Sequence, residues 1–481
     1  MASGRMREHA LRPNADTPSA AGALRGTRSD SGWRTNVITP NGLHAIDCAV
    51  GDAHGRAVGD TPHQPPSPNR AAGDDRLLTS ADTRQRRAKA PARRRLAAAL
   101  ALAVGLAACG SDGAAGASGL ADGAALRVAD ALAAGPVEGF ERAVAPPQLV
   151  FPRDHGPHPG FRTEWWYVTG HVATVAGRRF GVQLVFFRQA LAAIVPPRAG
   201  ALAARDMVFA HAALADVDGK RFHFDERISR AAGDLAFVRG PAADQPFAVQ
   251  CLDWSAIGAP GGDGFLPLRL AAPARDFAFD LELSMGKPVV LQGDSGLSRK
   301  SGEPGNASHY YSLTRLPLAG RVTCDGEVHD VLGEGWLDRE WSTSALGPEQ
   351  VGWDWFSLQL DGGVEVMWYQ LRRRDGGRDP WSRGVVVGPD GAATRLEPTA
   401  IELLPEGEWT AADGGARYPA RWRLRHRSEP AFDLAVAPLL ADQELRVIVR
   451  YWEGAVGVDG TFAGKPARGR GYLEMTGYTT R

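Results

Sequence analysis

An alternation of apolar and polar residues with a period of two, from about Leu149 to the C-terminus, most constrains how this chain can fold. Successive side chains of an extended chain point to opposite faces, so this period is typical of half-buried β-strands. The alternating runs are short, and turn signals separate them about every ten residues, with Asp361–Gly363 and Pro389–Gly391 as the clearest hairpin signals. Helical periodicity is nearly absent. The sequence therefore predicts an all-β protein of antiparallel strands.

The predicted strands fall into two successive sets, one in residues 149–342 and one in residues 343–481, each of about eight strands. Two closed or nearly closed barrels, or two sandwiches, would bury such strands. A barrel of about eight strands has an interior just wide enough for one small apolar ligand. This expectation is consistent with a carrier or with an enzyme that has a pocket.

The N-terminal part has a different composition. Residues 1–89 are rich in Arg, Ala, Gly, Pro, Ser and Asp without an apolar pattern, which is typical of disorder. Residues 90–108 contain three arginines, an apolar run and then LAAC ending at Cys109, which resembles a bacterial lipoprotein signal. A short buried helix is the alternative, because the run is too short to span a bilayer. We expect Cys109 to be lipidated and residues 109–148 to form a flexible tether.

Such a signal belongs at the start of a chain, so we expect translation to begin near Leu77 or Leu78 and residues 1–89 to be outside the native product. The expected location is the cell envelope, with a lipid anchor and the folded part facing the periplasm or the exterior. Cys251 and Cys324 then remain for an oxidising compartment, as one disulfide or as two free buried thiols.

The charge balance bears on the kind of partner. The chain has 55 basic and 55 acidic residues, a formal net charge of zero, and no basic stripe with interleaved aromatics. These observations argue against nucleic acid as the main partner.

The segment GEGWLDREW, residues 333–341, is the strongest candidate for a site. In an extended chain Trp336, Asp338 and Glu340 share one face, which places two carboxylates beside a large aromatic ring. Six of the thirteen tryptophans lie between residues 336 and 381. An aromatic cavity wall with a few ionisable groups is the usual small-molecule site. The alternative is a set of core tryptophans with Asp338 in an ion pair with Arg339.

Two other motifs have simpler explanations. GDSG at Gly293–Gly296 resembles the nucleophile motif of chymotrypsin-like proteases, but no upstream histidine has that family's surroundings, so a glycine-rich loop is favoured. His155 and His158 could ligate a metal, but the flanking prolines and the missing third ligand favour a structured turn. No HExxH, P-loop or GxGxxG motif is present.

Five separated segments resemble the carotenoid hydratase and AttH group of lipocalin-like proteins. They are FPRDHGPHPGFRTEWWYVTG, HYYSLTR, GEGWLDREWST, GWDWFSLQL and the terminal RYWEGAV to GRGYLEMTGY. The resemblance covers residues from about Phe151 to the C-terminus. It implies two consecutive lipocalin-like barrels and neither a metal nor an organic cofactor.

In the hydratases of this group a buried aspartate protonates a terminal isoprenoid double bond, and water captures the cation. The resemblance places Asp338 at that position. It implies His309, Tyr311 and Trp336 as catalytic neighbours, with His309 positioning water or holding the aspartate. The expected ligand-binding aromatic residues are Trp166, Trp341, Trp353, Trp355 and Trp368. Burial raises the pKa of a carboxyl group, and aromatic faces stabilise a cation, so the chemistry is physically sound.

Two functions remain open at this point. One is binding of an apolar isoprenoid or lipid, in association with a membrane transporter or an envelope stress system. The other is cofactor-independent hydration with Asp338 as the acid, and a secreted hydrolase is a more distant alternative. A buried, unpaired Asp338 that faces a cavity would favour chemistry, whereas pairing with an arginine would favour a structural role.

Overall fold

The computed structural model describes residues 137–194, 204–242, 245–260, 263–344 and 346–478. Almost all regular structure in these residues is antiparallel β-sheet, and the only helices among them are two single 3-10 turns, η1 (Arg153–His155) and η2 (Pro398–Ala400). The all-β prediction is therefore confirmed. In these ranges no helix is long and apolar enough to cross a membrane. Residues 1–89, the signal at 90–108, Cys109 and most of the tether lie outside the described residues.

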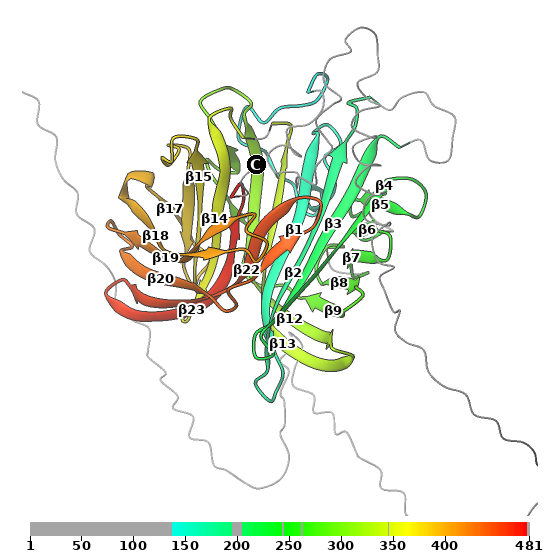
Figure 1. Cartoon of the computed structure of the whole chain (residues 1–481). Coiled ribbons are helices and arrows are strands. Elements are labelled where there is room, and N and C mark those ends of the chain that lie inside the picture. The colour runs from blue at the N-terminus through cyan, green and yellow to red at the C-terminus, as the bar shows by residue number, and fades with distance from the viewer. Residues whose placement is uncertain (1–136, 195–203, 243–244, 261–262, 345, 479–481) are drawn as a thin grey trace, which may run out of the picture. The chain divides into compact units, whose positions relative to one another are not determined.

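The first sheet has thirteen strands in the order β4-β3-β2-β1-β13-β12-β9-β8-β7-β6-β5, with β10 and β11 paired to β12 (Figure 1). Its strands are β1 (Thr163–Ala173), β2 (Arg179–Ala190), β3 (Asp206–Asp216), β4 (Arg221–Arg230), β5 (Ala236–Arg239), β6 (Ala248–Cys251), β7 (Trp254–Gly258), β8 (Leu268–Pro273), β9 (Phe277–Leu283), β10 (Val290–Leu291), β11 (Leu297–Arg299), β12 (Ala307–Cys324) and β13 (Glu327–Ser342).

This sheet curls until its two ends approach each other. The Cys251 thiol on β6 donates a 3.3 Å hydrogen bond to the carbonyl of Val208 on β3, near the other end of the strand order. The enclosed side chains form a continuous core in which Trp166, Phe180 and Trp254 are fully buried. The interior is packed with apolar side chains, as in a protein core.

The second sheet has ten strands in the order β17-β16-β15-β14-β23-β22-β20-β19-β18, with β21 paired to β22. Its strands are β14 (Gln350–Leu360), β15 (Val364–Arg373), β16 (Arg383–Val387), β17 (Ala393–Leu396), β18 (Ile401–Thr410), β19 (Arg417–His426), β20 (Phe432–Pro438), β21 (Glu444–Arg446), β22 (Arg450–Phe462) and β23 (Lys465–Met475). Trp368, Trp422 and Trp452 fill its own core. The prediction of two barrel-like antiparallel sheets is confirmed.

A third apolar cluster lies between the two sheets and joins them, with residues from β1, β2, β3, β10, β12, β13, β14, β15, β16, β22 and β23. Figure 1 shows the first sheet, cyan to yellow-green, beside the second, yellow to red. The two sheets lie close together at Gly181 on β2, where an added Cβ would lie 2.6 Å from the Cβ of Ala455 on β22 and 2.8 Å from the Tyr472 hydroxyl. Only glycine fits at this crossing without displacing the neighbouring sheet.

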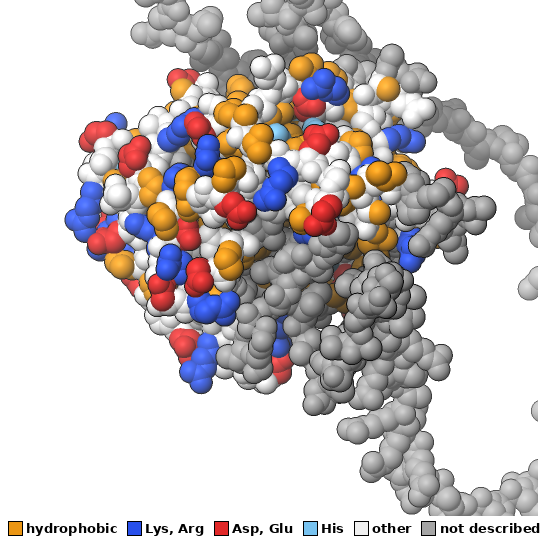
Figure 2. All heavy atoms as spheres, turned by 90° about the horizontal axis from the view of Figure 1, so that it is seen from above, with side chains coloured by type: hydrophobic (Ala, Val, Ile, Leu, Met, Phe, Trp, Pro, Cys, Tyr) orange, Lys and Arg blue, Asp and Glu red, His pale blue; other side chains and the backbone are white. Residues whose placement is uncertain are grey.

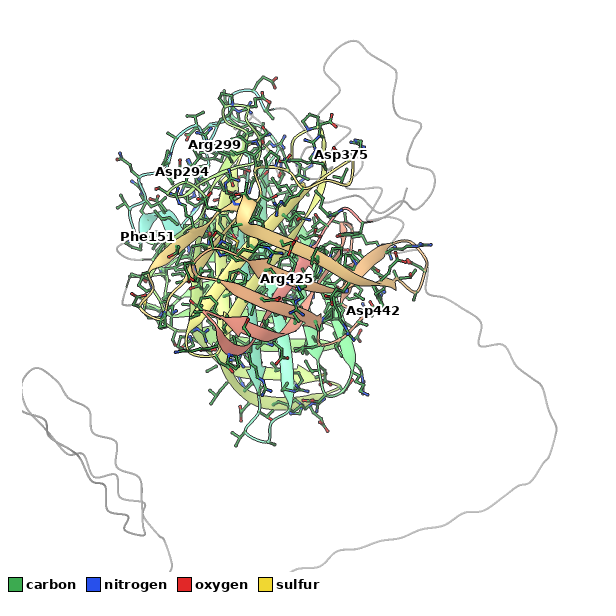
Figure 3. All side chains as sticks on the ribbon, turned by 90° about the vertical axis from the view of Figure 1, so that its left-hand side faces the viewer. Phe151, Asp294, Arg299, Asp375, Arg425 and Asp442 are labelled. Carbon is green, nitrogen blue, oxygen red and sulfur yellow. The ribbon has the colours of Figure 1, made fainter. Side chains whose placement is uncertain are left out.

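The outer surface carries mixed charge. Figure 2 shows acidic and basic side chains interspersed over one face, and Figure 3 looks toward the second sheet, with Arg425 of β19 near the centre of the view. Arg423 and Arg425 both pair with Asp433 on the neighbouring strand. Such exposed pairs contribute little to stability. Of the alternatives left open for the cysteines, the structure has Cys251 and Cys324 as two free buried thiols.

Candidate functional site

A cavity lies between the two sheets rather than inside either of them. Its volume of about 140 Å³ is roughly ten times what one water molecule needs, so it has room for a small organic molecule. Its lining residues come from both sheets and from the segments beside them: Thr163, Trp165, Tyr167, Val185, Phe187, Phe209, His211, Lys300, Tyr310, Asp338, Glu340, Ser342, Ser344, Leu346, Trp353, Trp355, Tyr369, Leu371, Val449, Tyr451, Glu453 and Glu474. The expectation of a ligand inside one barrel is corrected, because apolar side chains fill both interiors.

Strand register builds the first wall. Asp338 on β13 lies opposite Tyr167 on β1 and opposite Ser312 on β12. Two residues along β13, Glu340 lies opposite Trp165 and Tyr310 in the same way. Because side chains of a strand alternate between faces, these two rows point to the same side of the sheet, toward the cavity.

Asp338 is the most constrained acid of this wall. It accepts hydrogen bonds from the Tyr310 hydroxyl (2.6 Å), the Ser312 hydroxyl (2.5 Å) and the Trp336 indole N–H (2.7 Å). Burial nevertheless raises the pKa of Asp338 to about 7, because the loss of solvation outweighs these three hydrogen bonds. Among the described residues no arginine or lysine pairs with it. At neutral pH this carboxyl group can therefore both hold and release a proton.

Glu340 has a different environment. Its carboxylate pairs with Lys300 at 3.0 Å and accepts a hydrogen bond from Ser308. The Lys300 ammonium group also lies 4.8 Å from the centre of the Tyr369 ring on the second sheet. Two carboxyl groups two residues apart thus differ in the partners that surround them.

The second wall carries two more acids. Glu453 on β22 and Glu474 on β23 lie opposite each other in the register. Burial raises the pKa of Glu474 to about 7, and burial together with the charge of Glu474 raises the pKa of Glu453. Glu453 accepts a hydrogen bond from Tyr167 across the cavity, and the Tyr451 hydroxyl interacts with the same carboxyl group. Two adjacent buried carboxyl groups favour sharing one proton.

Aromatic rings form most of the remaining lining. The indole N–H of Trp353 donates to Glu474 at 3.1 Å, and Trp355 packs edge-on against Tyr167 with 5.2 Å between ring centres. His211 is buried and its pKa is lowered to about 3 by desolvation, so the ring is neutral, and it hydrogen-bonds the Tyr451 hydroxyl at 2.9 Å. The site combines apolar aromatic walls with carboxyl groups that retain protons near neutral pH.

The structure brings together only some of the predicted catalytic residues. Asp338 faces the cavity, and Trp336 lies directly behind it. His309 and Tyr311 were expected beside Asp338, and that placement is wrong. They lie on the opposite face of β12, where Tyr311 hydrogen-bonds His155 at 2.7 Å and His309 packs against Trp341. Tyr310, one residue along, occupies the position expected for Tyr311, because neighbouring residues of a strand face opposite ways.

The predicted ligand-binding tryptophans divide in the same way. Trp353 and Trp355 line the cavity. Trp166 and Trp368 lie in the cores of the first and second sheets, and Trp341 stacks on His158 with 3.8 Å between ring centres. The expectation for these three is corrected, since each ring points away from the inter-sheet space.

Arg339 does not pair with Asp338, because it faces the other side of β13. Its guanidinium group is fully buried, pairs with Glu164 at 2.9 Å and lies 3.8 Å over the Trp166 ring. Arg188 pairs with the same Glu164. His155 and His158 lie beside this network in a packed turn, where His155 stacks on Phe265 at 3.9 Å. This cluster holds the first sheet together behind the site.

Sequence reasoning missed Glu453, Glu474 and Lys300. Glu453 and Glu474 each interrupt an apolar run, in RYWEGAV and GYLEM. A single acidic residue within an otherwise apolar strand is unusual, and this feature of the sequence could have pointed to both residues. Lys300 follows the glycine-rich turn at Gly293–Gly296 and carries no comparable signal. Ser295 of that turn is exposed and lies next to the ion pair of Asp294 with Arg395.

Comparisons with known proteins agree with this architecture. The family model described as AttH-like matches residues 142–478. The crystal structure of an AttH protein from Nitrosomonas europaea is 36% identical, covers 70% of this chain and 100% of its own, and superposes with a TM-score of 0.61.

Kievitone hydratase from Nectria haematococca shares the fold at 16% identity, covering 71% of this chain and 96% of its own, with a TM-score of 0.53. No curated protein matches the sequence. The family match spans both sheets and both walls of the cavity, as the resemblance seen in the sequence implied, and the chain belongs to the AttH-like family of lipocalin-like proteins.

Proposed function

We propose that this protein binds an apolar, unsaturated small molecule in the inter-sheet cavity and adds water to one of its carbon–carbon double bonds without a cofactor. Asp338 carries the proposal, because it is a buried acid with a pKa near 7 that faces an aromatic cavity and lacks a cationic partner among the described residues. A general acid works best when its pKa lies near the working pH. An isoprenoid or a similar lipid fits the apolar lining.

The reaction uses groups on both walls. Protonated Asp338 donates its proton to one alkene carbon, and the neighbouring carbon becomes cationic. The rings of Trp355, Tyr167 and Trp353 stabilise that charge. A water oxygen then bonds to the cation, and the Glu453–Glu474 pair accepts the proton that this water loses. The Glu453–Glu474 pair then releases its proton to solvent and Asp338 takes one up from solvent, so the net change is addition of one water molecule.

The fold neighbours support this class of reaction. Kievitone hydratase has the same two-sheet architecture, and its name describes addition of water. Its identity to this chain is low, so it supports the reaction type and leaves the substrate open. A secreted hydrolase has less support, because Ser295 is exposed outside the cavity.

The direct test incubates the purified protein with prenyl and lycopene-type alkenes in oxygen-labelled water and measures labelled alcohol by mass spectrometry. We expect Asp338→Asn to lower the rate by a factor of about 100 or more, the usual share of a general acid. Asp354→Asn is the control: Asp354 is also buried, with its pKa raised to about 6 by burial, but it lies outside the cavity, pairs with Arg372 at 3.2 Å and accepts a hydrogen bond from Tyr478. Unchanged product formation in Asp338→Asn would remove Asp338 as the acid.

Binding without turnover is the second candidate. It is favoured by the three hydrogen bonds that Asp338 accepts, because these hold a carboxylate as a fixed anchor. Retention of an unchanged isoprenoid by the wild-type protein, with no labelled alcohol from any alkene tested, would select this function.

We further propose that the protein is a lipoprotein anchored through Cys109 in the cell envelope, where it delivers its ligand to or from a membrane transporter. The LAAC segment after a basic and apolar run supports the anchor. Metabolic labelling with a radioactive fatty acid tests it. Label in the wild type that disappears in Cys109→Ser is expected, and label that persists would place the modification elsewhere.

A further inference from the structure

We propose that His223, Cys324 and Asp325 form a zinc-binding site at one end of the first sheet, outside the cavity. The Cys324 sulfur lies 3.7 Å from Nε2 of His223 and 3.8 Å from Oδ2 of Asp325. The three potential ligand atoms all lie within 4.8 Å of one another. None of these residues lines the inter-sheet cavity, so the proposal is independent of the proposed function.

The acceptors around the Cys324 sulfur outnumber the one hydrogen of its thiol, although Arg178 already donates to Asp216 at 2.8 Å. A third group, Oδ2 of Asp216, also lies 3.8 Å from the Cys324 sulfur. The thiol has one hydrogen, so it can satisfy only one of the two carboxylate oxygens and the imidazole nitrogen that surround it. Oδ1 of Asp325 pairs with Arg221 at 2.5 Å, which leaves Oδ2 directed to the sulfur. Several lone pairs directed at one point are the arrangement that a cation requires.

The distances fit zinc closely. With Zn–S near 2.3 Å, Zn–N and Zn–O near 2.1 Å and tetrahedral angles, sulfur and its neighbouring ligand atoms should be about 3.6 Å apart. The observed 3.7 and 3.8 Å therefore need movements of only a few tenths of an ångström. A thiolate and an imidazole select zinc over magnesium or calcium, which prefer oxygen ligands. Water can complete the fourth position, since Arg178 and Gly219 already donate to Asp216, and Cys324 loses its proton to solvent when the metal binds.

Backbone structure holds the ligands in place. Cys324 ends β12, and the two-residue turn Asp325–Gly326 has φ angles of 55° and 80° before β13 begins. These positive angles fit a tight hairpin turn, which fixes the direction of Asp325. Cys324 is buried while Asp325 is exposed, so the metal can enter from solvent.

The site would tie two distant parts of the sheet together. His223 lies on β4, the strand at one end of the sheet order, which pairs only with β3. Cys324 lies 101 residues away on β12. A shared zinc ion would fasten the edge strand across the curled sheet and raise the stability of the folded state by mass action.

Cobalt substitution tests the proposal in the reduced full chain. The metal-free protein is titrated with Co²⁺, and the ultraviolet thiolate-to-cobalt absorption band is recorded. We expect a band that Zn²⁺ displaces and Mg²⁺ does not, that Cys324→Ser abolishes, and that Cys251→Ser retains. Cys251 is the matched control, because it is also a free buried thiol but donates to the Val208 carbonyl.

The Asp325→Asn variant tests whether a lost cobalt band results from misfolding rather than from a lost ligand. Asparagine also tolerates a positive φ, so this variant should keep the turn. It should keep the circular dichroism of the wild type while weakening cobalt binding by a factor of about ten or more, as expected when a ligand charge is lost. Zinc should raise the melting temperature of the wild type and leave that of Cys324→Ser unchanged. A cobalt band that survives in Cys324→Ser, or no band in the wild type, would overturn the proposal.

Discussion

The phenol oxygen of Tyr310 on the first sheet accepts a 3.1 Å hydrogen bond from the indole N–H of Trp355 on the second sheet. The same phenol donates a 2.6 Å hydrogen bond to Asp338. The direction of the chain Trp355 to Tyr310 to Asp338 is fixed, because an indole nitrogen can only donate. A residue of the second sheet thus influences the proton affinity of the acid on the first.

Tyr310→Phe should shift the pH dependence of the proposed reaction. The Tyr310 hydrogen bond lowers the pKa of Asp338, so its loss should raise that pKa further, on the order of one unit. The high-pH limb of the kcat/KM profile should then move upward by the same amount. Tyr311→Phe is the control, since it removes a hydroxyl that bonds His155 on the other face of β12. An unmoved limb in Tyr310→Phe would show that Asp338 does not set the profile.

The contribution of Asp338 to stability should fall as the pH rises from about 4 to about 7. In the unfolded chain an aspartate has a pKa near its ordinary value of about 3.9, whereas burial raises the pKa of Asp338 in the folded protein to about 7. The folded state therefore holds a proton that the unfolded state has released, and each pH unit in this window costs it up to about 1.4 kcal/mol. Urea unfolding at a series of pH values should show that Asp338→Asn loses less stability, or gains more, over this window than the wild type does. Asp361→Asn, at an exposed turn, should keep the wild-type slope.

Substitution of a tryptophan that lines the cavity and substitution of one that does not should have different effects on ligand affinity. Trp355→Leu should weaken binding of the fluorescent isoprenoid retinol by a factor of about ten, because the ring lines the cavity and loses its contact with the ligand. Trp341→Leu should leave the affinity unchanged in the fraction that folds, and should lower the urea midpoint, since this ring packs on His158 outside the cavity. Equal losses of affinity in both variants would contradict the inter-sheet location of the ligand.

Removal of one partner from the buried ion pair should destabilise the first sheet. Arg339→Met leaves the fully buried Glu164 with Arg188 and without its second cation. Such a loss costs about 3–5 kcal/mol of unfolding free energy. Urea denaturation measures it, and the double variant Glu164→Gln with Arg339→Met should recover part of the loss. A double variant less stable than the single one would mean that Arg188 still needs the charge of Glu164, so an unbalanced Glu164 charge is not what destabilises Arg339→Met.

The sequence predicted the strands well because the evidence for a strand is local. The alternation in GEGWLDREW placed Trp336, Asp338 and Glu340 on one face, as the structure has them. The partner strands were harder to infer. Whether His309 or Tyr310 shares a face with Asp338 depends on the register between β12 and β13, and a shift of one residue exchanges the two faces.

The cavity itself could not be predicted from either half of the chain. Glu453 and Glu474 reach Asp338 only because the second sheet packs against the first, and no local pattern encodes that packing. In the sequence, the tryptophans that form barrel cores, such as Trp166 and Trp368, cannot be distinguished by residue type from those that line the site. Only the face on which each ring lies distinguishes them.

The absence of a side chain at Gly181 has a consequence for the range of molecules this protein can admit. A methyl group at residue 181 would collide with Ala455 and Tyr472, so the two sheets would have to move apart at this crossing. The spacing between the two walls of the inter-sheet cavity is thus constrained by a residue that does not line it. Selection could therefore adjust the size of accepted molecules while every group that touches them stays the same.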